Sequence, residues 1–405
     1  MHGAPYREDL RKQRTKHRTE RISGNSARSA VPLISLEMIV DRRTRWIKRV
    51  RSAGRPEFQI MDIKKYLKQL CEAYGPTGFE RPVARLAAEA IAPYTDDVSI
   101  DTLANVVAVK RCSIPGAHKL LLAAHLDEVG LVVTGHEDGF LCVGQIGGLD
   151  PRVLPDRDLM VLTDPPRFGV VSVQPPHVLK AEDMSKALKQ EDLRVDVGLT
   201  QEEAVREIPV GTPVVFRTEG FELLNGRYVS KTLDDRASFA ALIRVAELIK
   251  DKKLPWDMYF IGSSGEERSE GGAPAAAYET DADVCIAIDV GQAAVPDSTP
   301  DVLSDLGKGP ILKVGPNFTR HIEKRLTALA EKDQIPLQRV ATPGKSGTDA
   351  WYMHIVKGGV ASAIVEFPLR YMHSPTECLD FGDVELTARL LAAYALDPGK
   401  EALEC

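Results

Sequence analysis

The sequence has no long hydrophobic run: none of its 405 residues lie in a stretch approaching the roughly 20 apolar residues that a membrane-spanning helix requires. Val31–Val40 is the best candidate for the core of a secretion signal, but it is short and interrupted by Glu37. The six cysteines include no CxxC pair, which disfavours a disulfide framework and fits a reducing compartment. We therefore expect a cytoplasmic protein that does not contact membranes.

Several nucleotide-binding and catalytic motifs are also absent. The chain has no Walker loop, and the glycines of residues 144–148 do not have the spacing of a dinucleotide fingerprint. His136-Glu137 lacks the second histidine of an HExxH metalloprotease helix. Gly262–Gly265 is one residue shorter than the nucleophile elbow of α/β-hydrolases. These absences disfavour four common classes of enzyme.

Charge is distributed unevenly along the chain. Residues 1–60 contain 15 Lys and Arg against six Asp and Glu, whereas the remainder contains 37 against 52. Because the remainder is acidic, we expect no nucleic-acid partner. The first sixty residues are expected to form a separate, disordered basic extension.

A regular pattern of secondary structure begins at Met61. Leu120–Ala124 is a continuous apolar run, typical of a strand buried on both faces of a parallel sheet, and helical spacing recurs between such runs. Between about 136 and 227, short strand-like stretches are separated by Gly, Pro and Asp turns. We therefore predict a three-layer α/β/α catalytic domain over residues 61–135 and 228–398, interrupted by an inserted β-rich domain over residues 136–227.

Metal-ligand side chains recur where the predicted strands end. These residues are His125 and Asp127, Glu266 and Glu267, Asp289, and His373, with Asp234 and Asp235 at the start of a helix. Because binding crevices of open α/β sheets lie at the carboxyl ends of the strands, these positions can converge. Imidazole and carboxylate ligands suit zinc or cobalt, with manganese as a third candidate. The pattern predicts two divalent metal ions, which can polarise a carbonyl and activate a water molecule.

Local spacing suggests how some of these residues divide the chemistry. Successive side chains on an extended strand end diverge, so one of Glu266 and Glu267 can bind metal while the other serves as a general base. Asp127 lies two residues after His125, on the same side, where it can accept the distal N–H of the imidazole. A Glu pair or an Asp pair alone is usually a solvated surface or a helix cap. Only the joint occurrence carries the hypothesis.

The same residues lie in motifs that resemble those of the M42 family of dinuclear aminopeptidases, the TET peptidases. The similar segments follow the family's order over about residues 61–397: Tyr74–Glu80, Ala124–Gly130, Ser230–Arg236, Gly265–Glu267, Ala287–Val290, Leu306–Pro310, Gly347–Ala350 and Arg370–Ser374. Three features depart from the family pattern, namely the serines at 263 and 264, Ser346 in place of a glycine, and the first sixty residues. We expect the serine changes to affect the specificity pocket rather than the ligands.

The resemblance implies a role for each candidate residue. One metal would be held by His125, Asp235 and Asp289, and the other by Asp235, Glu267 and His373, with Asp235 bridging. Glu266 would be the general base, and Asp127 and Asp234 would support the ligands. The choice of Asp235 over Asp234 as the bridge rests on alignment alone and stays open. The resemblance also implies a PDZ-like insertion and a homo-oligomer, a hollow dodecamer.

The leading hypothesis is an aminopeptidase that releases N-terminal residues from peptides. One alternative is a metal-dependent deacylase or carboxypeptidase on the same frame, for which Arg370 is the candidate clamp for a substrate carboxylate. Another is an endoglucanase-type glycoside hydrolase, which needs two carboxyl groups about 5–9 Å apart and no metal. A non-catalytic, metal-binding assembly protein is the remaining alternative.

Overall fold

The computed structural model describes residues 61–174, 176–179, 188–296, 298 and 303–403. The chain divides into two units, Met1–Phe58 and Gln59–Cys405, and the description below concerns the second unit. The expectation for the basic extension lies outside the described residues.

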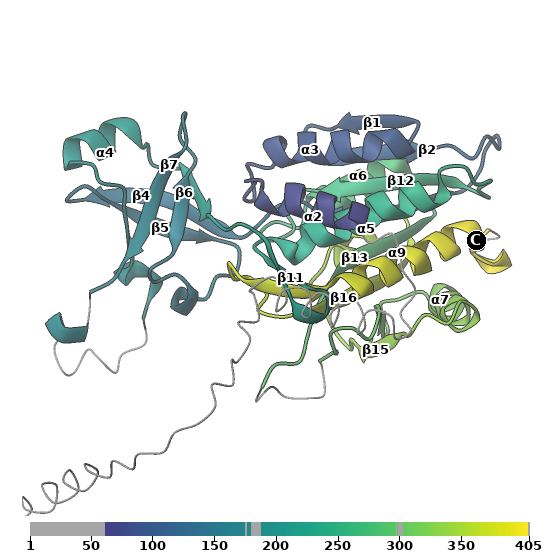
Figure 1. Ribbon diagram of the computed structural model, residues 1–405. Helices are drawn as coiled ribbons and strands as arrows, with labels where there is room; N and C mark the ends of the chain where they lie inside the picture. The colour runs from purple at the N-terminus through teal and green to yellow at the C-terminus, as the bar shows by residue number, and fades with distance from the viewer. Residues whose placement is uncertain (1–60, 175, 180–187, 297, 299–302, 404–405) are drawn as a thin grey trace, which may run out of the picture. The chain divides into compact units, whose positions relative to one another are not determined.

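An eight-stranded sheet forms the centre of the larger domain, with the order β1-β2-β12-β3-β13-β16-β14-β15 (Figure 1). In chain order its strands are β1 (Asp97–Ile100), β2 (Val106–Lys110), β3 (Lys119–His125), β12 (Asp257–Ser263), β13 (Val284–Gln292), β14 (Ile311–Val314), β15 (Gln338–Ala341) and β16 (Ala361–Leu369). The four central strands β12, β3, β13 and β16 are parallel. Their carboxyl ends therefore meet at one edge, which is where ligand-type residues were expected.

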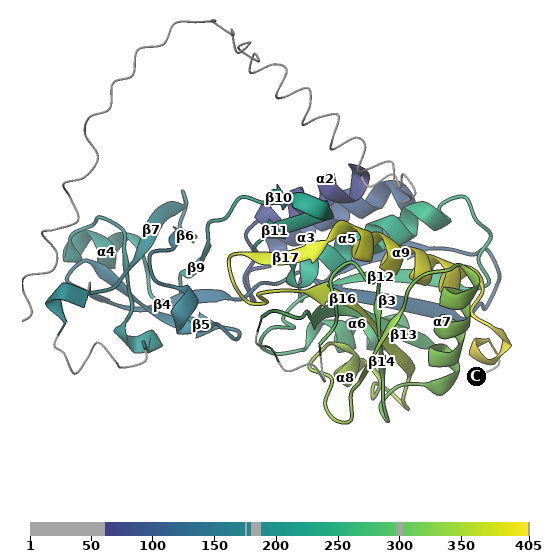
Figure 2. The same ribbon diagram turned by 60° about the horizontal axis from the view of Figure 1, so that its bottom comes forward.

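Helices cover both faces of this sheet (Figures 1 and 2). The helices are α2 (Met61–Glu72), α3 (Arg81–Ile91), α5 (Leu233–Ile249), α7 (Arg320–Lys332) and α9 (Phe381–Leu396) on one face, and α6 (Gly272–Thr280) and α8 (Ala350–Met353) on the other. Leu120 and Leu122 pack into the hydrophobic core between the sheet and the first set of helices, whereas Leu121 and Ala123 pack into the core beneath α6 and α8. This alternation explains the continuous apolar run of β3, because each face of the strand needs its own apolar residues. The predicted three-layer α/β/α fold is confirmed.

The inserted segment forms a closed six-stranded barrel with its own hydrophobic core. Its strands and one helix are β4 (Gly130–Glu137), β5 (Phe140–Ile146), β6 (Asp158–Val161), β7 (Arg167–Ser172), β8 (Arg194–Asp196), α4 (Gln201–Glu207) and β9 (Pro213–Phe216). The insertion of a β-rich domain is thus confirmed, and the boundaries 136 and 227 stay predictions.

A small third sheet lies next to the main one and orders the strands β10-β11-β17. Its strands are β10 (Phe221–Leu223), β11 (Arg227–Ser230) and β17 (Glu377–Asp380). Short 3₁₀ turns complete the described chain: η1 (Ala92–Tyr94), η2 (Pro151–Val153), η3 (Pro176–Val178), η4 (Gln190–Asp192), η5 (Leu224–Gly226) and η7 (Lys400–Ala402). Within the described residues, no helix combines the length and apolar character needed to cross a bilayer.

Candidate metal centre

The candidate site lies at the carboxyl ends of β3, β12 and β13. His125 is the last residue of β3 and pairs in register with Ser263, the last residue of β12. The chain then leads from Ser263 to Glu266 and Glu267, while Asp289 lies in the second half of β13. The parallel register of neighbouring strands therefore brings together residues that are far apart in sequence.

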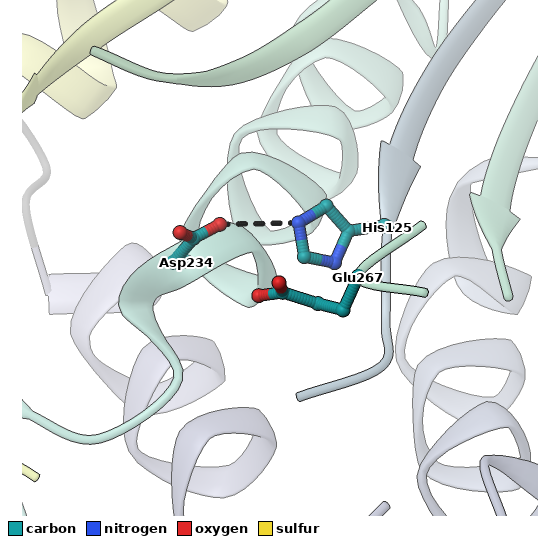
Figure 3. A group of neighbouring side chains, drawn as sticks. All are labelled: His125, Asp234 and Glu267. Atoms are coloured by element: carbon teal, nitrogen blue, oxygen red, sulfur yellow. Dashed lines mark hydrogen bonds and ion pairs between the residues drawn. The ribbon is translucent and has the colours of Figure 1, made fainter. Parts of the chain in front are cut away.

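Among the described residues, two groups of side chains could each hold a metal ion. His125, Asp234 and Glu267 form one group, and His125, Asp235 and Asp289 form the other, with the ligand atoms of each group within 4.8 Å of one another. Figure 3 shows the first group, in which the Asp234 carboxylate faces the His125 ring. The two groups share His125, so they belong to one continuous cluster.

Asp234 lies between the two histidines. Its Oδ1 is 3.1 Å from His125 Nε2, and its Oδ2 is 3.4 Å from His373 Nε2. Glu267 Oε2 lies 3.3 Å from the same His373 nitrogen. His373, predicted from sequence as a ligand, is therefore brought to the cluster by contacts with two of its carboxylates.

Asp235 occupies a different place from its neighbour. Its Oδ2 accepts a hydrogen bond of 3.1 Å from the backbone N–H of His125. Its Oδ1 is buried and has no hydrogen-bond partner among the described residues. Both aspartates have non-helical backbone angles at the start of α5, and the peptide bond between them is cis.

Asp127 connects the histidine to the glutamate pair. It is fully buried, and one of its oxygens lies 3.5 Å from His125 Nδ1, whereas its backbone carbonyl oxygen lies 3.3 Å from that nitrogen. Its carboxylate also accepts hydrogen bonds from the backbone N–H groups of Glu266 and Glu267, at 3.1 and 3.2 Å. A single carboxylate thus orients both the imidazole and the chain that carries the glutamates.

The ring of His373 is oriented by the inserted barrel. Its Nδ1 lies 2.7 Å from the carbonyl oxygen of Gly148, in the turn after β5. Because a carbonyl can only accept, Nδ1 donates to Gly148, and Nε2 is the nitrogen that faces the Asp234 and Glu267 carboxylates, to which it donates when the ring is protonated. A Cβ at Gly148 would lie 3.3 Å from this nitrogen, so the close approach favours glycine. In the sequence, Gly148 stands out only among glycines that lack the spacing of a dinucleotide fingerprint.

Burial and mutual repulsion shift the pKa values of the acidic groups. Burial, reinforced by Asp289 and Asp349, raises the pKa of Glu266 to about 10 despite the opposing effect of His125. Burial likewise raises the pKa values of Asp235 and Asp289. Such clustered carboxylates hold protons when no cation is present.

The groups near the histidines behave differently. Burial lowers the pKa of His373, but Asp234 and Glu267 outweigh it and raise that pKa to about 12. For Asp234 the two histidines outweigh burial and lower the carboxyl pKa. His373 and Asp234 therefore form a strongly attracting pair.

A buried ion network lies beneath the cluster. Glu128 accepts hydrogen bonds from Lys231 Nζ at 2.7 Å and Arg236 Nη2 at 3.1 Å, and both cationic side chains are at most 1% exposed. Glu128 directly follows Asp127, and Lys231 and Arg236 lie on either side of the Asp234-Asp235 pair. The network therefore fixes the segments on which the candidate ligands lie, and sequence spacing gave no indication of it.

The two serines before the glutamate pair are engaged in hydrogen bonds. Ser263 Oγ donates to Asp349 Oδ2 at 2.5 Å, and the hydroxyl of Ser264 donates to Asn105 Oδ1 at 3.1 Å. Next to them, a largely apolar recess of about 990 Å³ is lined by Ser264, Gly265 and the side chains of Phe79, Leu86 and Leu103. A recess therefore borders the segment that carries Glu266.

The chemistry of this donor set fits divalent cations. Imidazole nitrogens and carboxylate oxygens are suitable ligands for zinc, cobalt or manganese. The buried Asp235 Oδ1 without a partner also fits, since an isolated buried carboxylate oxygen is costly unless a positive charge or a donor meets it.

Comparison with known proteins agrees with this geometry. The family model of M42 glutamyl aminopeptidases matches residues 104–390. A lysyl aminopeptidase of Pyrococcus furiosus is 35% identical over 333 residues, which cover 81% of this chain and 95% of the relative. The chain therefore belongs to the M42 peptidase family.

Solved structures of related proteins share the fold. An aminopeptidase from Desulfurococcus kamchatkensis superimposes with a TM-score of 0.79 at 32% identity, covering 86% of this chain and 98% of that one. The TET1 peptidase of Pyrococcus horikoshii, described as assembling into a tetrahedron or a large octahedral shell, has a TM-score of 0.74 at 28% identity over 83% of this chain and 99% of that one. The family resemblance inferred from the motifs is thus confirmed.

We expect the metal-free protein to become less stable as the pH rises. The pKa values of Glu266 and His373 are raised from 4.5 and 6.5 to about 10 and about 12. Between the usual and the raised values the folded chain retains protons that the unfolded chain has released, so the free energy of unfolding falls with pH. The lowered pKa of Asp234 acts in the opposite direction only below its usual range near pH 4.

Thermal unfolding of chelator-treated protein between about pH 6 and pH 9 measures this effect. Added divalent cation should stabilise the protein more at the higher pH, because metal binding displaces the retained protons. If the thermal unfolding midpoint of the metal-free protein rose with pH, the raised pKa values of Glu266 and His373 would be contradicted.

Proposed function

We propose that this protein is a metal-dependent aminopeptidase that binds two divalent cations, zinc or cobalt or else manganese, and releases N-terminal residues from peptides. The observation that carries the proposal is the position of Asp234, whose two oxygens face the imidazoles of His125 and His373. Family membership supports the peptidase activity, and the apolar recess lined by Ser264 and Gly265 supports the binding of a peptide.

In this proposal the cluster divides into two half-sites. His125 and Asp289 would hold one cation, and Glu267 and His373 the other. A pair of cations bound there would polarise the scissile carbonyl and lower the pKa of a water molecule.

We propose Asp234 as the bridging ligand, in place of Asp235, which the family resemblance implied. Asp234 reaches both histidines, whereas Asp235 accepts the His125 backbone N–H through one oxygen and approaches Asp289 and His125 in the other ligand group. Asp235 would then support the His125 half-site.

Glu266 is our candidate for the general base. Its Oε2 lies 3.8 Å from His125 Nε2, at the edge of the cluster, and its backbone is held by Asp127. With cations present, its raised pKa would fall toward the neutral range in which a carboxylate exchanges protons efficiently. Glu266 Oε2 would take a proton from water and deliver it to the leaving amine.

We also propose that the protein acts as a cytoplasmic homo-oligomer. The TET1 peptidase of Pyrococcus horikoshii can assemble into a tetrahedron or a large octahedral shell, and the solved structure of PhTET1-12s contains a dodecamer, which supports a multimer such as a dodecamer. The described cysteines, at 71, 112, 142, 285 and 378, are all free thiols, which is consistent with a reducing compartment.

Replacing the base should abolish turnover while metal binding remains. For Glu266→Gln we expect kcat on an aminoacyl anilide to fall by about 10²–10⁴-fold, because the amide cannot accept the proton. Metal content per subunit, measured on the same preparation, should stay at two. A variant that keeps both metals and most of its activity would refute the role of Glu266.

The two aspartates can be separated by matched amide substitutions. Asp234→Asn should weaken binding of both cations, since it removes the charge shared by both half-sites. Asp235→Asn should weaken chiefly the cation held by His125 and Asp289. Equilibrium titration with a metal indicator measures both losses, and the reverse order of severity would return the bridging role to Asp235.

Metal removal and substrate choice test the class of reaction. Excess chelator should abolish hydrolysis of aminoacyl anilides, and zinc or cobalt should restore it. N-acyl amino acids and cellulose oligosaccharides serve as the comparison substrates. Exclusive turnover of the acyl amino acids would favour the deacylase, and glycoside hydrolysis in excess chelator would favour the endoglucanase.

A further inference from the structure

Glu377 is a buried carboxylate next to the cluster that the proposed function does not use. It is the first residue of β17, is 2% exposed, and pairs in register with Ser230, the last residue of β11. The chain leaves β11 toward Asp234 and reaches β17 from His373. The β11–β17 pairing therefore places Glu377 between these two candidate ligands.

Each oxygen of Glu377 accepts a hydrogen bond from one of these ligands. Oε1 accepts the backbone N–H of His373 at 2.8 Å, and Oε2 accepts the backbone N–H of Asp234 at 3.0 Å. The side chains of the same two residues also approach each other, with His373 Nε2 3.4 Å from Asp234 Oδ2. One carboxylate thus holds both backbones at the spacing that lets their side chains converge.

The local backbone explains why such a side chain is needed. His373 has a positive φ of 59°, and Asp234 has non-helical angles at the start of α5, so neither N–H lies in a regular helix or strand ladder. A buried backbone N–H without an acceptor costs free energy comparable to a lost hydrogen bond. A carboxylate can satisfy both groups, whereas an amide offers only one acceptor oxygen.

The geometry also distinguishes Glu377 from a ligand. Both of its oxygens are directed to backbone donors, and it is in neither ligand group found among the described residues. Its action on a bound cation would be exerted through the residues that it holds.

We infer that Glu377 is a positioning residue that sets the separation of Asp234 and His373, and thereby the affinity of the cation held by His373 and Glu267. The inference rests on the proposed two-cation site. Residues that orient metal ligands typically change metal affinity by about 10–100-fold when they are altered.

Glu377→Gln is the decisive variant, because its amide group would face one of the two N–H donors with another donor. We expect the cation of the His373 half-site to bind about 10–100-fold more weakly, and the cation of the His125 half-site to be affected less. Stepwise zinc titration against a chromophoric chelator resolves the two constants without any measurement of activity.

Glu385→Gln is the matched control. Glu385 is likewise buried, and it accepts hydrogen bonds from Arg244 of α5 at 3.0 Å and from Arg389 of α9 at 2.8 Å. Within the described part of the chain, its hydrogen bonds and ion pairs are with these two arginines and not with the candidate ligands. It should lower the unfolding midpoint of the metal-free protein and leave both zinc constants unchanged. Glu377→Asp, which keeps both acceptors on a shorter side chain, should give an intermediate loss of affinity and serves if Glu377→Gln does not fold.

Unchanged zinc constants in both Glu377 variants would overturn the inference, as would an equal loss of affinity in Glu385→Gln. A wild-type protein that binds two cations but hydrolyses no aminoacyl substrate would overturn the proposed function alone. In that case a selective loss in Glu377→Gln would still support the positioning role.

Discussion

The structure depends on one electrostatic constraint, the burial of several carboxylates in a single cluster with the buried imidazole of His125 and the partly exposed imidazole of His373. Asp234, Asp235 and Asp289 are each at most 7% exposed. Buried charges of one sign are tolerated only when protons, cations or donors neutralise them. The raised pKa of Glu266 and the unpartnered oxygen of Asp235 are two consequences of this constraint, and positive charge bound in the cluster would relieve both.

The fold meets this constraint by holding the candidate ligands in place with hydrogen bonds from neighbouring residues. The parallel strands bring the ligands to one edge, but the edge alone does not orient them. Asp127, Glu377 and Gly148 provide the orientation, each through hydrogen bonds to a candidate ligand or to the chain that carries one. Two of these three supports act on backbone N–H groups, so the shape of the loops is as important to the site as the identity of the ligands.

The location of the site was predicted from the rule that binding sites of open α/β sheets lie at the carboxyl ends of the strands. The rule could be applied because apolar runs such as β3 and β13 are long enough to be recognised as strands and end at polar residues. The same rule could not separate Asp234 from Asp235. Two adjacent aspartates at the start of a helix look alike in the sequence. The direction of each side chain depends on the local backbone angles, and these depend on partners that are distant in sequence. Glu377 and Gly148 were missed for the same reason, since the Gly148–His373 contact joins residues 225 positions apart.

The position of the barrel in the sequence gives its contact with His373 a structural logic. The chain enters the barrel at Gly130, shortly after His125 and Asp127, and returns through β11 to the aspartate pair. Both connections therefore start or end at candidate ligands, and the turn after β5 adds a third contact through Gly148. Because the same segments anchor the barrel and carry the ligands, a shift of the barrel would move His373 and the ends of both connections together. The inserted domain is therefore part of the framework of the site.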